Sequence, residues 1–304
     1  MPHTAMKRFV VRPAQANDLE AVAKLIAKQQ AADFGQVLRT TEDLRKLWDH
    51  MDLELQTCTA YSDGHLAGYA ELLNGDEPYI YLMERGNVDL AFQLLKIMED
   101  IALAHSNGSV KLMTKISENN KPLLQLFASN GYRSDLSFMM METELKSSPP
   151  QPHWPDGLSV RPFVVGQDEM ATYQADEEAG EDKGYHTPLD YESWRARMRM
   201  DQDAFDPGLW FLATDGQEIA GVALNYYDAA TEIGWVDHLS VRRGWRRKGV
   251  GRALLLHSFG AFYERGIQRV KLNVDSKSLT NAPLLYNQVG MQKVNQYHVY
   301  TKII

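Results

Sequence analysis

The chain has 304 residues, and at about 100–200 residues per domain this length predicts two domains. With 44% hydrophobic and 24% charged residues it has the composition of a globular protein, and its net charge of -8 argues against a general nucleic-acid-binding protein. The single cysteine, Cys58, excludes a disulfide framework and a Cys-rich zinc site, and no apolar run approaches the roughly 18 residues of a membrane span. Because the start of the chain also lacks an apolar stretch of signal-peptide length, we expect a cytoplasmic protein with neither nucleic-acid nor membrane partners.

The first half of the chain alternates between strand-like and helix-like patterns. Apolar and β-branched runs predict strands near 8–14, 56–62, 66–73, 77–84 and 109–116. Amphipathic spacing predicts helices at 17–32, 41–51, 87–105 and 119–129. The segment 147–157 then holds four of the twelve prolines, which favour extended connections. We interpret it as a linker between a first domain, 1–146, and a second domain, 158–304.

The second half continues with the same alternation. The patterns predict strands at 158–163, 208–214, 218–226, 233–242 and 268–274, and a last hairpin across 291–303. Helices are expected at 166–180, 188–202, 251–265 and 280–288.

Several short motifs occur once in each half. Val11-Arg12-Pro13 resembles Val160-Arg161-Pro162, and the Leu-Phe before Gly131 resembles the Leu-Tyr before Gly290. The repeat is too long for a solenoid, so it indicates a duplicated domain. The predicted fold class is therefore α/β (α+β), with two tandem domains that each have a central mixed, mostly antiparallel sheet flanked by helices.

A basic cluster interrupts the acidic chain between Arg242 and Arg252, where six of eleven residues are Arg or Lys. It lies where a predicted strand turns through Gly249 and Gly251 into a predicted helix. Glycines let the backbone approach a ligand closely, and the free N–H groups of a first helical turn attract anions. The order of strand, glycine turn and helix favours a phosphate site over a solvated basic surface.

The motif Arg246-x-x-Gly249-x-Gly251 resembles the signature of the GCN5-related N-acetyltransferase (GNAT) superfamily, and Ala282-x-x-Leu285-Tyr286-x-x-x-Gly290 resembles its second motif. The resemblance implies acetyl-CoA as cofactor, with its pantetheine arm paired like a strand along Leu239, Ser240 and Val241. Its pyrophosphate would lie at Arg246, Arg247, Lys248, Gly249, Val250, Gly251 and Arg252, with further contacts near Ser278 and Asn281. The tandem plan of two such domains also occurs in the superfamily.

Acetyl transfer requires a proton for the leaving thiolate and a base for the attacking amine. The resemblance places Tyr286 beside the sulfur, and a phenol and a thiol have similar pKa values of about 10 and about 8.5; the alternative is a purely structural aromatic. In strict alternation along 233–241, Trp235, Asp237 and Leu239 share one face. Related enzymes take the base from that face, so Asp237 is the first candidate, and His238 on the other face is the second.

The acceptor is less defined by the sequence. The acidic residues between Asp176 and Asp182 could attract a cationic amine or form a solvated surface. The first half lacks the glycine signature and has Phe127 at the position of Tyr286, so we expect a degenerate domain without acetyl-CoA binding.

We expect an acetyl-CoA-dependent N-acetyltransferase that acts on a small-molecule primary amine in a ternary complex, as a monomer or homodimer. The alternatives are a protein or peptide acceptor, and a non-catalytic CoA-binding sensor.

Overall fold

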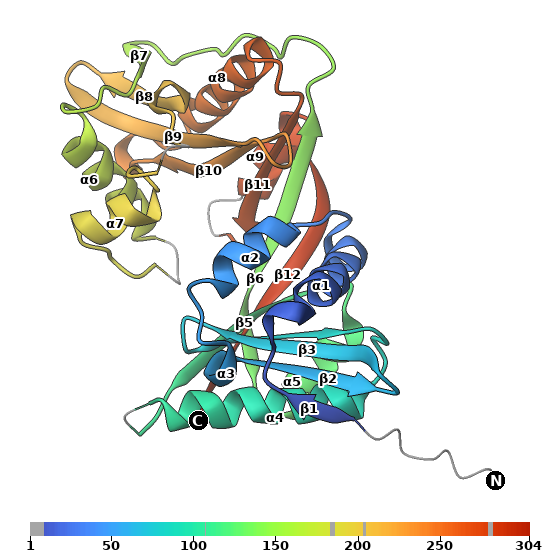
Figure 1. Cartoon of the computed structure of the whole chain (residues 1–304). Coiled ribbons are helices and arrows are strands. Elements are labelled where there is room, and N and C mark those ends of the chain that lie inside the picture. The colour runs from blue at the N-terminus through green and yellow to red at the C-terminus, as the bar shows by residue number, and fades with distance from the viewer. Residues whose placement is uncertain (1–8, 107, 183–185, 203–204, 279–281) are drawn as a thin grey trace. The chain divides into compact units, whose positions relative to one another are not determined.

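The structure is a computed structural model that describes residues 9–106, 108–182, 186–202, 205–278 and 282–304 (Figure 1). The chain forms two compact units. Unit 1 is Met1–Ser137 with Asn295–Ile304, and unit 2 is Phe138–Val294. No helix of the described ranges is both long enough and apolar enough to cross a membrane.

Unit 1 is built from strands with helices on both of their faces. Its helices are α1 (Leu19–Phe34), α2 (Thr41–Trp48), α3 (Leu53–Gln56), α4 (Val88–Ala104) and α5 (Lys121–Ser129). Its strands are β1 (Val10–Arg12), β2 (Thr57–Ser62), β3 (His65–Leu73), β4 (Glu77–Leu82), β5 (Lys111–Ser117) and the first part of β6 (Arg133–Glu144). The order β1-β2-β3-β4 is antiparallel throughout, and β5 pairs with the last strand of the chain, β12 (Gln292–Ile303).

Local sequence explains the hairpins of unit 1. Asp63-Gly64 joins β2 to β3, and the three residues from Asn74 through Gly75 to Asp76 join β3 to β4. Asp63, Gly64, Asn74 and Gly75 have positive φ. Asp-Gly favours a two-residue hairpin turn because both central residues must be left-handed, and Asn and glycine likewise tolerate the left-handed region in the longer loop. One hydrophobic core lies between the sheet and α4, and a second core joins the other face to α1 and α2.

Unit 2 repeats this plan. Its helices are α6 (Glu169–Gly180), α7 (Tyr191–Arg197), α8 (Val250–Glu264) and α9 (Ala282–Gln288). Its strands are β7 (Leu158–Pro162), β8 (Trp210–Asp215), β9 (Glu218–Asp228), β10 (Ile233–Val241) and β11 (Arg269–Asp275), and the order is β6-β11-β10-β9-β8-β7. The core on one face includes Leu254, Phe259 and Phe262 of α8, and the core on the other includes Ala175 of α6 and Trp194 of α7.

Strands β10 and β11 separate partway along their length. They are the parallel pair of unit 2, and they are paired only from Ile233 to Trp235. Beyond that point β10 stays paired with β9 as far as Val241, and β11 stays paired with β6 as far as Asp275. The sheet therefore opens between the second half of β10 and β11.

The duplicated motif has the same structure in both units. Arg12 donates two hydrogen bonds, of 2.7 and 2.8 Å, to the carboxylate of Asp18. Arg161 does the same to Asp168, at 2.6 and 2.8 Å. Bidentate pairs of this kind fix the entry of each first helix. The predicted fold class, two tandem α/β domains with mostly antiparallel sheets, is confirmed.

Two features differ from the sequence prediction. Strand β6 was not predicted, and 291–303 contains one long strand, β12, where a hairpin was expected. Each of these strands is divided between the two units, β6 at Ser137/Phe138 and β12 at Val294/Asn295. Residues 138–144 of β6 pair with β11 in unit 2, while residues 297–303 of β12 pair with β5 in unit 1. The packed units consequently exchange their terminal strands, which local patterns do not reveal.

Candidate functional site

The backbone N–H groups at the start of α8 lack hydrogen-bond acceptors among the described residues. Gly249 precedes the helix with φ of 91°, no side chain caps it, and Arg247 is also left-handed with φ of 60°. In the described part of the chain, no acceptor contacts the backbone N–H groups of residues 247–252. Six consecutive free donors at the positive end of a helix form a ready anion site.

The six cations of the basic cluster fall into two groups. Arg242 bonds Glu178 at 2.6 Å, Arg243 bonds Asp182, and Arg246 bonds Asp182 and also donates to the carbonyl of Val241 at 2.9 Å. Arg247, Lys248 and Arg252 are exposed, and none of them has an ion-pair partner among the described residues. The charge available to a ligand is therefore concentrated at the start of α8, and Arg246 is held by the protein itself.

The acidic run 176–182 supplies those partners. Arg243 and Arg246 lower the pKa of the Asp182 carboxyl well below its ordinary value through hydrogen bonds. Glu177 contacts His186 at 3.2 Å and accepts from the backbone N–H of Leu189. Most of the carboxylates of the run are therefore paired within the chain, although Glu181 is exposed.

The remaining residues expected at the cofactor lie around the opening between β10 and β11. Leu239, Ser240 and Val241 form the part of β10 that β11 does not pair, although the Ser240 side chain itself points to α6. An added Cβ at Gly251 would lie 3.5 Å from Leu285 and 3.6 Å from Val241, so α9 and the end of β10 both approach the first turn of α8. Ser278 is half-buried beyond β11, and Asn281 lies outside the described residues.

A bulge in β10 changes which of its side chains share a face. The register with β9 shifts between Val236 and His238, so strict alternation, and the face assignment made from it, is wrong. Val236 packs in the α8 core with Leu239, whereas His238 lies on the opposite face, toward α6. Asp237 is the bulged residue, and its side chain is exposed.

Asp176 of α6 anchors that second face. Its carboxylate is 4% exposed and accepts from His238 Nδ1 at 2.7 Å, Ser240 Oγ at 2.7 Å and Trp194 Nε1 at 2.9 Å. Burial alone would raise its pKa, but His238, Ser240 and Trp194 together hold the pKa of Asp176 well below its ordinary value. Because an ionised carboxylate only accepts, His238 must present a protonated Nδ1 to it. The sequence did not indicate this buried role for Asp176.

Asp237 borders a cavity of about 330 Å³ between the end of α7, strand β8 and the ends of β9 and β10. Its apolar walls include Phe205, Trp210 and Leu224, and Tyr226 also lines it. Sites of this volume, with mostly apolar walls and a few polar groups, are typical of small-ligand binding. The cavity lies on the same face of the sheet as α7, against the second half of β9 and the bulge of β10.

Tyr286 of α9 is buried, with 7% of its surface exposed, in the core between α8 and the sheet. It lies next to Leu285, which approaches Gly251 at the first turn of α8. The helix that carries Tyr286 is therefore at the same end of β10 as the free backbone donors.

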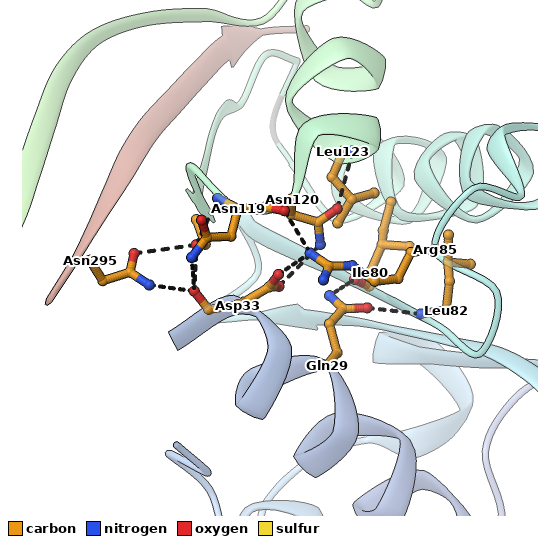
Figure 2. Close-up of polar contacts among 10 residues, drawn as sticks. Gln29, Asp33, Ile80, Leu82, Arg85, Asn119, Asn120, Leu123 and Asn295 are labelled. Atoms are coloured by element: carbon orange, nitrogen blue, oxygen red, sulfur yellow. Dashed lines mark hydrogen bonds and ion pairs between the residues drawn. The ribbon is translucent and has the colours of Figure 1, made fainter. Parts of the chain in front are cut away.

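The equivalent region of unit 1 is filled by its own side chains. Helix α4 is capped by Asn87, which accepts from the N–H of Leu90 at 3.1 Å, whereas α8 has no such cap. Arg85, in the turn before α4, forms an ion pair with the buried Asp33 at the end of α1 (Figure 2). Burial raises the pKa of Asp33.

Figure 2 shows that Asp33 also receives hydrogen bonds from Asn119 and Asn120, and one from Asn295 on β12. Phe127, at the position of Tyr286, is fully buried and has no hydroxyl. The turn of unit 1 that corresponds to the free amides of unit 2 therefore supplies Arg85 to a buried polar network around Asp33 of α1.

Comparisons with known proteins agree with this geometry. The family model for the acetyltransferase (GNAT) family matches residues 170–291. A crystal structure of a GCN5-related N-acetyltransferase from Sphaerobacter thermophilus is 32% identical, with a TM-score of 0.82, over 99% of this chain and 97% of that one. A tandem GNAT protein from the clavulanic acid biosynthesis pathway shares the fold with a TM-score of 0.68 at 13% identity, over 97% of this chain and 98% of that one.

Curated relatives include mycothiol acetyltransferases. That of Geodermatophilus obscurus is 25% identical over 93% of this chain and 95% of its own length. That of Streptomyces scabiei is 31% identical, but the match spans only 47% of this chain and 45% of that protein. Both the tandem plan and the family resemblance of the second half are confirmed. The chain belongs to the GCN5-related N-acetyltransferase family and is an acyltransferase of that kind.

Proposed function

We propose that unit 2 binds acetyl-CoA and transfers its acetyl group to the primary amine of a small molecule, by direct transfer in a ternary complex. The observation that carries this proposal is the row of six backbone N–H groups at residues 247–252 that have no acceptor in the described structure. A row of unpaired backbone amides at a glycine turn is a typical binding site for the oxygens of a diphosphate.

The surrounding residues fit the rest of the cofactor. Arg247, Lys248 and Arg252 are exposed cations beside the free amides, and they suit the charges of a nucleotide phosphate. The unpaired edge of β10 from Leu239 to Val241 suits an extended amide-bearing arm, because it offers strand-like hydrogen bonds. When bound, acetyl-CoA would supply an activated thioester carbonyl.

The reaction requires one proton transfer from the acceptor's ammonium group and another to the leaving sulfur. We assign Asp237 as the group that removes a proton from the incoming ammonium, directly or through a water, because its exposed carboxylate lies at the bulge beside the cavity. We assign Tyr286 as the donor of a proton to the departing sulfur. The amine nitrogen forms the new bond to the acyl carbon as the carbon–sulfur bond breaks and Tyr286 protonates the sulfur. The second proton that the nitrogen loses as the amide forms passes through water to the Tyr286 phenolate. The products are the free thiol, the amide and the proton taken up by Asp237.

Two further features support this reading. Cys58, the sole cysteine, is buried in unit 1, where burial raises the pKa of its thiol to about 12, so an acetyl-cysteine intermediate has no suitable nucleophile. In unit 1 the capped α4 and the Asp33–Arg85 pair leave no comparable row of free amides. We therefore infer that unit 1 binds no acetyl-CoA and acts as a structural partner.

The test measures thiol release from acetyl-CoA with a panel of primary amines, for the wild type and for Tyr286→Phe. We expect turnover with small amines, and a Tyr286→Phe variant that binds acetyl-CoA normally by isothermal titration but turns over at least about 100-fold more slowly. Tyr263→Phe, on the exposed side of α8, serves as the matched control and should retain wild-type turnover.

A fully active Tyr286→Phe would refute the proton-donor assignment. Binding of acetyl-CoA without turnover on any amine would instead support the sensor alternative, and turnover only on protein or peptide amines would refute the small-molecule acceptor.

A further inference from the structure

The cavity beside Asp237 contains charged groups of both signs that have no ion-pair partner among the described residues. Arg199 and Asp237 both line it, and neither forms an ion pair within the described residues. Of the other two carboxylates of the lining, Asp206 is paired with Arg265, whereas Asp228 accepts hydrogen bonds from Thr231 at 2.6 Å and from the backbone N–H of Ala230 but has no ion-pair partner among the described residues. The unneutralised charges of the cavity are therefore one cation, Arg199, and two anions, Asp237 and Asp228.

Tyr226 connects Arg199 and Asp237. The guanidinium of Arg199 lies over its ring, 4.7 Å from the centroid, and the ring stacks on Trp235 at 6.1 Å with an interplanar angle of 10°. Burial, together with the charge of Asp237, raises the pKa of Tyr226 to about 12, and Arg199 opposes the change. Both charges therefore act on the same side chain.

The backbone at Arg199 is specialised for this position. Its φ is 56°, a left-handed conformation that non-glycine residues rarely adopt. The turn after α7 thereby directs Arg199 onto Tyr226, whereas Arg197, two residues earlier and likewise exposed, does not line the cavity.

We propose that this cavity holds the acceptor and that the acceptor is a zwitterion with an apolar or aromatic body: an amine that also bears a carboxylate. The ammonium group lies at Asp237, at the bulge of β10, and the carboxylate lies at Arg199. The aromatic walls formed by Phe205, Trp210 and Tyr226 receive the body between them. This inference rests on the proposed acetyl transfer and adds the chemical class of its acceptor.

These charges disfavour acceptors that carry only one charged group. A monoamine without an anion would leave Arg199 without a carboxylate partner, and an anion without an amine would leave Asp237 unpaired. A guanidinium that pairs with a carboxylate at a partly exposed site changes affinity by about tenfold or more. A zwitterion satisfies both groups, and only its amine lies where acetylation would occur.

The experiment compares matched acceptors: phenylalanine with phenethylamine, and leucine with 3-methylbutylamine. Each pair shares its amine and body and differs in the carboxylate. Thiol release is measured for the wild type, Arg199→Gln and the matched control Arg197→Gln. Taking the ratio within each pair, and then comparing that ratio between variants, cancels the different intrinsic reactivity of the two amines.

We expect the wild type to favour the amino acid of each pair by at least about tenfold in kcat/KM, mainly through a lower KM. Arg199→Gln should remove this preference by raising KM for the amino acids alone, while Arg197→Gln should keep it. As a binding readout, 3-phenylpropionate, which cannot be acetylated, should bind the wild type in isothermal titration at least about tenfold more tightly than it binds Arg199→Gln.

Each other outcome has a defined meaning. Equal use of both members of a pair, or a preference that survives Arg199→Gln, overturns the inference and leaves the proposed acetyl transfer intact. Turnover confined to amines outside these pairs overturns it as well. Absence of thiol release with every amine refutes the proposed function itself.

Discussion

Asp176 is expected to be one of the most sensitive positions in unit 2. Its buried carboxylate accepts hydrogen bonds from Trp194, His238 and Ser240, and it joins α6 and α7 to β10. Asp176→Asn keeps the size of the side chain but replaces one acceptor oxygen by an NH2 group, which must face at least one of these three donors. Each hydrogen bond to a buried charged group contributes about 1.5–3 kcal/mol, and loss of the charge opposite a buried partner costs about 3–5 kcal/mol. We therefore expect the free energy of unfolding to fall by about 3 kcal/mol.

The assay is urea denaturation followed by the fluorescence of the six tryptophans, of which Trp194 is one. Asp201→Asn is the matched control, because Asp201 is exposed and its ion pair with Arg195 is on the surface. We expect that control to change the free energy of unfolding by less than about 0.5 kcal/mol.

The effect also has a defined pH dependence. Since the pKa of Asp176 is lowered on folding, the stability that its charge contributes is present above its unfolded value of 3.8 and is lost as the pH falls below that value. The difference between wild type and Asp176→Asn should therefore be constant above about pH 5 and shrink toward pH 3. A difference below about 1 kcal/mol at pH 7, or one that grows in acid, would refute this account of the buried network.

Two further predictions concern positions outside that network. Gly221→Ala should lower the free energy of unfolding by about 2 kcal/mol in urea denaturation, because its Cβ would lie 2.7 Å from the carbonyl oxygen of Ser240. The control Gly244→Ala, with open space around residue 244, should leave the free energy of unfolding unchanged. Equal effects of the two substitutions would contradict the tight contact of β9 with β10. Cys58 should react with a thiol reagent far more slowly in the native than in the unfolded protein, because its thiol is buried and burial raises its pKa to about 12. Rapid labelling of the native protein would contradict this. The Cys58→Ala variant should still release thiol from acetyl-CoA at the wild-type rate.

The sequence predicted the parts of the fold that depend on local patterns. Hydrophobic periodicity located most helices and strands within a few residues, and the repeated Val-Arg-Pro motif indicated the duplication that the Arg12–Asp18 and Arg161–Asp168 pairs confirm. The exchange of β6 and β12 between units could not be predicted in this way. It depends on pairings between residues more than a hundred positions apart in the sequence, such as Arg269 with Glu144.

The candidate site shows the same division. The glycine turn at Gly249 was visible because glycine and a following apolar helix form a local pattern. The division of the basic cluster into paired and free cations was not visible, because it depends on where α6 brings Glu178 and Asp182. A single bulge reversed the assignment of His238, since one extra residue changes the face of every side chain beyond it.

The central claim is that unit 2 alone binds acetyl-CoA, at the first turn of α8. The most direct test is isothermal titration of acetyl-CoA into the wild type and into a variant that carries Arg247→Gln, Lys248→Gln and Arg252→Gln together. The account predicts one binding site per chain in the wild type, and an affinity at least about 100-fold lower in the variant, since three charge-assisted contacts are removed. Two sites per chain, or unchanged affinity in the variant, would contradict it.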